Sequence, residues 1–151
     1  MAKKNVEIEG FDELHDLLMR MGKAAGDAAR EATEAGAKII EDAAQARAPR
    51  PGVIDIELVE SKPHRSIFNI GLKKDFWYLR YFESGAQPHE INGSPLIFDG
   101  DAGKVITKQV QHTGMAASPF LGPAIRKSQE AVMAVMGTVF KEVILRFVKG
   151  M

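Results

Sequence analysis

A stripe of small and apolar residues near the start of the chain constrains the fold more than any other feature. Between residues 14 and 46 these residues recur at steps of three or four, which places them on one side of an α-helix. Charged residues occupy the other side, and Glu34 and Lys38 have the favourable i,i+4 order. We therefore predict a helix over about residues 11–47, a rod of roughly 50 Å. The stripe consists of Leu14, Leu18, Met21, Ala25, Ala28, Ala32, Ala35, Ile39, Ala43 and Ala46.

The small size of the residues in this stripe indicates how the helix packs. Between residues 24 and 37 it is almost entirely alanine, and Gly22, Gly26 and Gly36 lie close by. Burial stabilises such a helix weakly, because alanine removes little apolar area from water at about 25 cal/mol per Å². Small side chains instead allow another backbone to approach closely. Two partners fit the pattern and both stay open: a neighbouring subunit, or the last helix of the same chain.

A β-rich middle is expected at about residues 53–117. Pro49, Pro51 and Gly52 end the first helix, since prolines and glycine do not continue it. Alternating residues predict two strands, 54–60 and 66–72, joined by a turn at 62–65. Residues 85–104 are expected to be rich in loops, with short strands at 96–98 and 104–110. One more short strand is predicted at residues 5–9.

A second helix is predicted at about residues 119–148. Pro123 suits its first position, because the N–H that proline lacks would be unpaired there anyway. Met133, Phe140 and Val148 widen the apolar face beyond one stripe, so we expect this helix to be buried on more than one side. The elements together predict a single α+β domain over residues 1–151. In it the long N-terminal helix and the C-terminal helix pack on a central antiparallel β-sheet.

The composition excludes several classes of protein. Twenty basic and 20 acidic residues leave no surplus positive charge of the kind that neutralises phosphates. The absence of cysteine excludes a disulfide framework, thiol catalysis and a thiolate-bound metal. The longest strongly apolar stretch, residues 131–140, is shorter than the roughly 20 residues of a membrane span, so no membrane element is expected.

Charge is unevenly distributed along the chain. Residues 101–151 hold seven basic and three acidic residues, whereas residues 1–100 have an acidic excess. This asymmetry fits a head-to-tail contact between unlike surfaces of neighbouring copies. It also fits pairing within one subunit, or charges that merely solvate the surface, and we favour these simpler interpretations.

Two clusters carry potential chemistry. His89, Glu90 and His112 lie in predicted loops that flank a hairpin, and they are the basis of one alternative, a metal-dependent hydrolase. The histidines lack the i,i+4 spacing of a zinc helix, so we expect hydrogen-bonding roles instead. The aromatic run at residues 76–82 surrounds Arg80 and suggests a second alternative, a sequence-independent DNA binder that stacks bases. We predict instead that this run is core. No enzyme, cofactor or bound metal is expected.

A series of motifs gives the chain a resemblance to a known family. Ala48-Pro49 follows the long helix, and residues 78–85 read Tyr-Leu-Arg-Tyr-Phe-Glu-Ser-Gly. Pro-His-Glu-Ile at 88–91 and Leu-Ile-Phe at 96–98 come next. Val-Gln-His-Thr-Gly at 110–114 and Ser-Pro-Phe-Leu-Gly-Pro-Ala at 118–124 complete the series. In this order the motifs resemble the tail-completion, or head–tail joining, proteins of long-tailed bacteriophages and prophages, a family related to the lambda tail-completion protein Z.

The resemblance implies a structural protein of the virion neck, assembled in the host cytoplasm. It implies a homo-oligomeric ring, expected to be a hexamer, at the head-proximal end of the tail. The ring would join the tail terminator or tail tube protein to the head connector, adaptor or stopper protein. DNA would pass through its lumen without sequence-specific binding. Another neck ring, a tail terminator or a head-side adaptor, is the alternative within this class.

The candidate interface and structural residues lie in the part of the chain where the resemblance is most specific, residues 78–124. Interface roles are expected for a loop at 88–91 and for five residues before it, namely Tyr78, Tyr81, Phe82, Glu83 and Gly85. Pro119, Phe120 and Pro123 are expected to set the start of the last helix. Each residue also has a purely structural alternative, because Pro, Gly and aromatic residues commonly end elements. The set is Tyr78, Tyr81, Phe82, Glu83, Gly85, Pro88, His89, Glu90, Ile91, His112, Pro119, Phe120 and Pro123.

Overall fold

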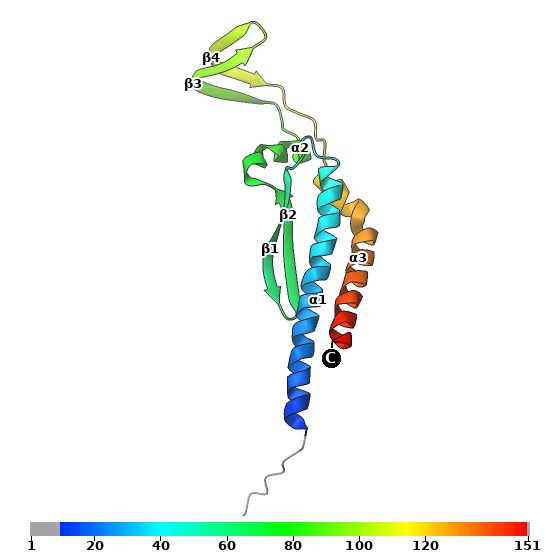
Figure 1. The fold of residues 1–151 in the computed structure, drawn as a ribbon. Coiled ribbons are helices and arrows are strands. Elements are labelled where there is room, and N and C mark those ends of the chain that lie inside the picture. Colours follow the sequence, from blue (N-terminus) through cyan, green and yellow to red (C-terminus); the bar gives the residue numbers. More distant parts are fainter. Residues whose placement is uncertain (1–9, 151) are drawn as a thin grey trace, which may run out of the picture.

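Two long helices and two β-hairpins make up the fold in a computed structural model that describes residues 10–150 (Figure 1). The α+β class predicted from the sequence is confirmed. The strand predicted at residues 5–9 lies outside the described residues. The elements in chain order are α1 (Phe11–Gln45), β1 (Ile54–Lys62), β2 (Arg65–Leu72), the 3-10 helix η1 (Lys74–Leu79), α2 (Arg80–Ser84), β3 (His89–Gly100), β4 (Gly103–His112) and α3 (Leu121–Lys149).

Helix α1 has clear chemical boundaries. It follows Gly10, which has a φ of 82°, and Asp12 and Glu13 lie in its first turn, where the helix dipole favours negative charge. It ends at Gln45, two residues before the predicted end. The Gln45 side chain then ties this end to the start of β1. Its Oε1 accepts hydrogen bonds from the Val53 and Ile54 amides at 2.9 and 3.2 Å.

The small-residue stripe of α1 packs against α3 of the same chain. Ala24, Ala28 and Ala32 are buried. A Cβ on Gly36 would lie 3.0 Å from Met136 and 3.1 Å from Val132, so this glycine permits the close approach of α3. Of the two partners that the sequence left open, the structure contains the intramolecular one. One long ion pair, Arg146 with Glu31 at 3.9 Å, also joins the two helices.

The β1–β2 hairpin lies on the other side of α1 from α3 (Figure 1). Its strands pair antiparallel from Ile54 opposite Leu72 to Lys62 opposite Arg65, and the predicted turn at 62–65 is confirmed. The turn reaches α1 at Gly26, where a Cβ would lie 2.9 Å from the Pro63 Cα. Glycine at this position therefore allows the hairpin tip to rest on the helix.

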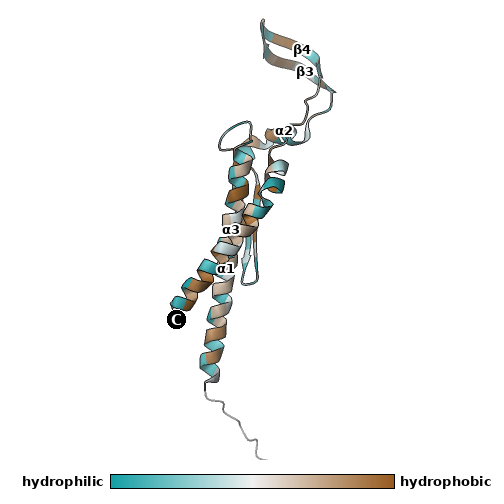
Figure 2. Ribbon diagram, turned by 90° about the vertical axis from the view of Figure 1, so that its right-hand side faces the viewer, coloured by the Kyte–Doolittle hydropathy of each residue, from teal (hydrophilic) through white to brown (hydrophobic). Residues whose placement is uncertain are grey.

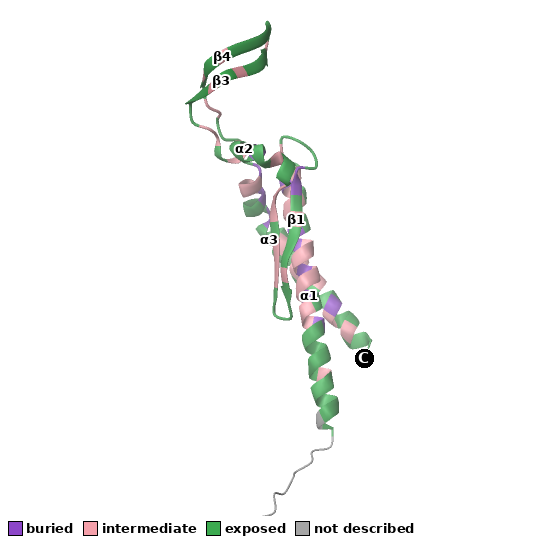
Figure 3. Ribbon diagram, turned by 90° about the vertical axis from the view of Figure 1, so that its left-hand side faces the viewer, coloured by how far each residue is buried: buried purple, intermediate pink, exposed green. Residues whose placement is uncertain are grey.

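The core sits where the end of α1, the start of β1, η1 and the start of α3 meet. Its most buried side chains are Val53, Ile54, Leu79 and Phe120, and Ala44 and Ala124 complete the cluster. Buried positions gather there and along α1 where α3 packs, whereas the first turns of α1 and the β3–β4 hairpin are exposed (Figure 3). The chain therefore has a small core for its length.

The β-rich middle forms two separate two-stranded sheets in place of the one central sheet predicted. Of the two, β1–β2 packs on α1, and among the described residues α3 packs on α1 and not on a sheet. Strands β3 and β4 form a second antiparallel hairpin that projects away beyond α2 (Figure 1). The short strands predicted at 96–98 and 104–110 lie within β3 and β4 and are confirmed, but the loops expected around them are wrong, because β3 is a strand from His89 to Gly100. Its turn-forming residues lie at a register shift between Asn92 and Leu96 and at the tip, Gly100 to Gly103. On either side of the shift the residues of β3 pair continuously with β4.

Helix α3 differs from its prediction in two respects. It begins at Leu121, so Pro123 is its third residue and still lies in the first turn, where the N–H that proline lacks would have no partner within the helix. Met133, Phe140 and Val148 are exposed, and Met133 retains 70% of its accessible surface. Burial on more than one side is therefore wrong for a single chain, which offers α3 only α1 as a long neighbour. Within residues 10–150, no helix combines the length and apolar character needed to cross a membrane.

Candidate functional site

A junction between the helices and the β3–β4 hairpin contains most of the predicted candidate residues. We define the junction as residues 79–88 and 113–123, and the arm as the hairpin of residues 89–112 (Figure 1). The outgoing and returning segments of the junction bond to each other. Ala86 and Met115 exchange amide-to-carbonyl hydrogen bonds of 2.9 and 2.8 Å, and the Ser118 amide donates to the Phe82 carbonyl at 2.7 Å. These hydrogen bonds hold the base of the arm, and we call the bonded segments, residues 82–86 and 114–118, the stem.

Glycines allow the two segments of the stem to lie this close. Gly85 and Gly114 have φ values of 73° and 83°, a region that side chains disfavour. A Cβ on Gly114 would lie 2.6 Å from the Ala86 carbonyl oxygen, and one on Gly85 would lie 2.9 Å from the Met115 carbonyl oxygen. Gly85 was a predicted candidate, and its role in the structure is to permit this contact.

Glu83 caps the N-terminus of α3 from a distant part of the chain. Its Oε2 accepts hydrogen bonds from the Phe120 and Leu121 amides at 2.8 and 3.0 Å, and its Oε1 accepts one from the Gly122 amide at 2.7 Å. The amides at the start of a helix, including these three, have no partner within the helix, and the helix dipole also favours a negative charge there. One carboxylate therefore joins α2 to α3.

This environment shifts the titration of Glu83. Partial burial raises the pKa of the carboxyl, but the amides of Gly122, Phe120 and Leu121, followed by the charge of Arg126, lower it by more. The net pKa lies below the ordinary glutamate value, so the folded state favours the carboxylate. The capping interaction is therefore fully present near neutral pH.

The remaining junction candidates serve the core to different extents. Phe120, with 2% of its surface exposed, is one of the most buried side chains, and Phe82 packs against the same cluster. Pro123 is half-buried and Pro119 is exposed. Phe120 anchors the start of α3 in the core and is not available to a partner.

The two candidate histidines meet at the base of the arm. The predicted loops are strands here, and His89 is paired with His112 at the first position of the β3–β4 register. Their rings stack with centroids 4.9 Å apart. Each ring also bonds to the neighbouring backbone: His89 Nδ1 lies 2.9 Å from the Gln87 carbonyl oxygen, and His112 Nδ1 accepts a bond of 3.1 Å from the Gly114 amide. The pair closes the arm next to the stem.

Glu90, Ile91 and Pro88 are exposed around this base. The Glu90 carboxylate accepts hydrogen bonds from Asn92 and from Gln111 across the hairpin, at 2.8 and 3.1 Å. Within residues 10–150, no three His, Asp or Glu side chains are grouped so as to hold a metal ion. His89, Glu90 and His112 are thus neighbours that engage in hydrogen bonds and ring stacking.

The aromatic run at residues 76–82 is divided between core and surface, so the prediction that it is core is wrong for most of it. Leu79 is buried and Phe76 and Phe82 are half-buried, whereas Trp77 is 57% exposed and Tyr78 and Tyr81 are also exposed. The physical reason is the helical backbone of η1 and α2, which turns successive side chains to different sides.

The exposed members form an ordered surface cluster with Arg80. The Arg80 guanidinium lies 5.3 Å from the Trp77 ring centroid and 4.9 Å from that of Tyr81, distances suited to cation–π contact. Arg80 also donates a hydrogen bond of 3.0 Å to the Tyr81 hydroxyl, and Trp77 meets Tyr78 and Tyr81 edge-on. We call Trp77, Tyr78, Arg80 and Tyr81 the aromatic patch.

Sequence reasoning did not name Trp77 or Gly114 as individual candidates, and it considered Arg80 only for the DNA-binding alternative. Trp77 is the only tryptophan of the chain, and tryptophan is enriched at contact surfaces, which is a usable signal. Gly114 was part of the motif at 110–114, but its role depends on Ala86, 28 positions earlier, and is visible only in three dimensions.

Comparisons of the chain with known protein-family models, with curated proteins and with solved structures found no match. A functional assignment therefore depends on the sequence motifs and on the geometry of the junction, the arm and the exposed surfaces.

Proposed function

We propose that this chain is a tail-completion, or head–tail joining, protein of a long-tailed bacteriophage or prophage. It acts as a structural component of the virion neck and is assembled in the host cytoplasm. Copies of the chain form a ring, expected to be a hexamer, which joins the tail terminator or tail tube protein to the head connector, adaptor or stopper protein. The ring has no bond-making chemistry of its own, and DNA passes through its lumen. The motifs at residues 78–124 motivate this assignment.

The observation that carries the proposal is the exposed area of the single chain. Its accessible surface is 11583 Å². A compact monomer of 16.5 kDa exposes about 7,600 Å². The ten residues outside the described range account for at most about 1,600 Å² of the difference, which leaves an excess of about 2,400 Å². A standard interface covers about 800 Å² on each partner, so the excess suffices for the two neighbours of a ring subunit.

The kind of surface exposed also supports assembly. Large apolar side chains are exposed on α3, on the first turns of α1 and on the arm, including Leu18, Met133 and Ile106. A two-stranded hairpin is only marginally stable by itself in water, so an arm with exposed isoleucines is better suited to lie against a partner. The capped and bonded junction gives this arm a defined direction.

Another neck ring, a tail terminator or a head-side adaptor, stays the alternative within the class. The aromatic patch favours one further candidate, sequence-independent DNA binding, because bases stack on exposed aromatic rings and arginine. Such a protein would lose DNA affinity steeply as salt increases. A neck ring is expected to show no such affinity at physiological salt.

Two measurements test the proposal. Native mass spectrometry of the purified protein should show a closed oligomer of one defined copy number. Electron microscopy of particles assembled without the gene should show tails that fail to join heads, and addition of the purified protein should restore joined particles. A stable monomer that is absent from finished particles would overturn the assignment.

A double variant addresses the hydrolase alternative. His89→Ala with His112→Ala removes both imidazoles from the base of the arm. A metal enzyme would lose bound metal and activity, as measured by elemental analysis and turnover. A ring protein is expected to keep its copy number and to lose at most the stability that the stacked pair contributes.

A further inference from the structure

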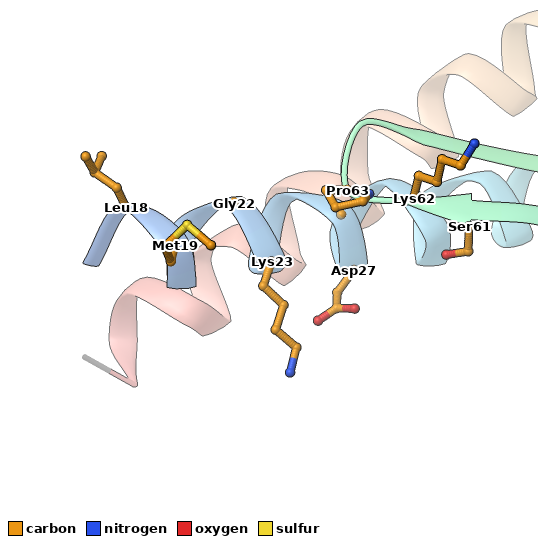
Figure 4. A pocket seen from close by; sticks show the side chains of 9 residues that line it. Leu18, Met19, Gly22, Lys23, Asp27, Ser61, Lys62 and Pro63 are labelled. Atoms are coloured by element: carbon orange, nitrogen blue, oxygen red, sulfur yellow. The ribbon is translucent and has the colours of Figure 1, made fainter. Parts of the chain in front are cut away.

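An apolar groove lies at the N-terminal end of α1. It has a volume of 450 Å³ and lies between α1 and the β1–β2 turn, with Leu18, Met19, Gly22 and Pro63 in its wall (Figure 4). Figure 4 shows Pro63 resting over the helix, while Lys23 and Asp27 project from it. The groove therefore has apolar walls and charged side chains beside it.

Two glycines of α1 build the groove. Gly26 lets the turn approach the helix, since a Cβ there would lie 2.9 Å from the Pro63 Cα. A Cβ on Gly22 would meet no other described atom within 4 Å, so this glycine contributes open space to the groove. A side chain from elsewhere can occupy that space without displacing any part of the described chain.

The α3 helix of the same chain does not cover this end of α1. Leu14, Leu18, Met19 and Met21 all keep about half or more of their surface exposed. Helix α3 crosses α1, and its C-terminal end lies away from the α1 axis (Figure 2). The first turns of α1 thus present an apolar face with no partner from the described residues.

The C-terminal end of α3 has the complementary properties. It exposes Leu145 and Val148, and it carries three basic residues against one acidic residue between positions 139 and 149. Residues 12–27 of α1 carry four acidic residues against two basic ones. Both ends are apolar, exposed and oppositely charged, a combination that favours association in one orientation.

We propose that the groove at the start of α1 binds the C-terminal end of α3 from a second copy of the chain. Leu145 and Val148 enter the space beside Gly22, and Lys141 and Lys149 face the acidic side chains of α1. Each copy donates one end and receives the other, so the contact is heterologous and closes into a ring when the rotation permits. This contact rests on the proposed function, since it supplies the ring's subunit interface.

Filling the groove gives the first test. Gly22→Leu occupies the proposed space, and its Cβ meets no other described atom within 4 Å. The variant is expected to weaken self-association about tenfold or more in sedimentation velocity, with an unchanged circular dichroism spectrum. Gly137→Leu is the matched control: this α3 glycine also has no other described atom within 4 Å of a Cβ and lies outside the proposed contact.

A charge exchange gives the second test. Asp16→Lys with Asp27→Lys makes one variant, and Lys141→Glu with Lys149→Glu makes the other. Each alone places like charges at both sides of the contact and is expected to stay monomeric. An equimolar mixture restores opposite charges at every contact between unlike variants, so native mass spectrometry should show rings of even copy number in which the two variants alternate.

The results distinguish a failure of the proposed contact from a failure of the proposed ring. If both charge variants and Gly22→Leu assemble like the unmodified chain, the groove is not the interface, although the proposed ring stands. If Gly137→Leu alone blocks assembly, the interface lies on the other side of α3 and the proposed contact is overturned. If the unmodified chain forms only a closed dimer that the variants disrupt, the contact is supported and the ring is contradicted. A chain that is monomeric at every concentration contradicts both.

Discussion

The Glu83 carboxylate and the Gly122 amide, 39 positions apart in the sequence, are joined by a hydrogen bond of 2.7 Å that fixes the start of α3 to α2. Phe120 and Leu121 donate to the other oxygen of the same carboxylate. The bond matters for the whole molecule because the arm leaves the helices at this point. A change at Glu83 is therefore expected to affect the direction of the arm as well as the stability of the core.

Replacement of the capping carboxylate measures its contribution. Glu83→Gln keeps the size of the side chain but removes the charge and one of the two acceptor oxygens. We expect the free energy of unfolding to fall by about 1–2 kcal/mol, since hydrogen bonds to charged groups are the stronger ones. Urea denaturation followed by circular dichroism gives the value. Glu130→Gln, at an exposed glutamate of α3 with no side-chain hydrogen bond or ion pair among the described residues, is the control and should change it by less than about 0.5 kcal/mol. Equal effects at both positions would argue against the cap.

The same residue predicts a pH dependence. Because the pKa of Glu83 is lower in the folded chain than the ordinary value of 4.5, its contribution to stability is complete above about pH 4.5. It is lost as the pH falls through the folded-state pKa. The difference in unfolding free energy between the unmodified chain and Glu83→Gln should shrink over that range. The pKa of Glu34, lowered by the Lys38 side chain, is common to both proteins and cancels in the comparison. A difference that stays constant down to about pH 3 would contradict the prediction.

A side chain at Gly114 should open the stem of the arm. Its φ of 83° and the 2.6 Å separation of a Cβ from the Ala86 carbonyl oxygen make alanine both strained and obstructed. Gly114→Ala is expected to cost about 2 kcal/mol or more and to increase hydrogen exchange at the Ala86 and Met115 amides. Gly71→Ala, where a Cβ meets no other described atom within 4 Å, should change stability by less than about 1 kcal/mol.

The division of the aromatic run between core and surface can be measured with two variants. Leu79 is 1% exposed, so Leu79→Ala should lower the free energy of unfolding by about 2–5 kcal/mol. Trp77→Ala should change it by less than about 1 kcal/mol, because most of that ring is already in water. Chemical denaturation compares the two. A loss at Trp77 as large as that at Leu79 would mean that the patch is packed in the folded chain.

Two glycines of α1 should respond in opposite directions to the same substitution. Gly22→Ala is expected to raise stability by about 0.5–1 kcal/mol, since alanine favours the helix and the site is open. Gly26→Ala places a methyl group against the backbone of Pro63 and should lower stability by about 1–3 kcal/mol. Thermal unfolding of the two variants checks the signs, and a gain at Gly26 would show that the turn does not rest on the helix.

Patterns within short stretches predicted much of this fold. The spacing from Leu14 to Ala46 predicted α1 to within two residues of its end, and alternation around the 62–65 turn predicted the β1–β2 hairpin. Glycines and prolines between residues 85 and 104 led to the wrong prediction of loops, because their spacing does not reveal that they fall at an irregularity and a tip. Most of the candidate residues lie together in the junction, but the cap at Glu83 was not foreseen.

Local patterns predict the type of most elements, because helix periodicity, strand alternation and turn chemistry act between residues a few positions apart. They do not predict that α3 packs on the small-residue stripe, that β3–β4 stands apart from β1–β2, or that Trp77 faces water. These outcomes depend on which distant segments meet, and a linear pattern does not encode such meetings. The same reason explains why the apolar face of α3 predicted burial on more than one side, whereas within the described chain only α1 packs along it.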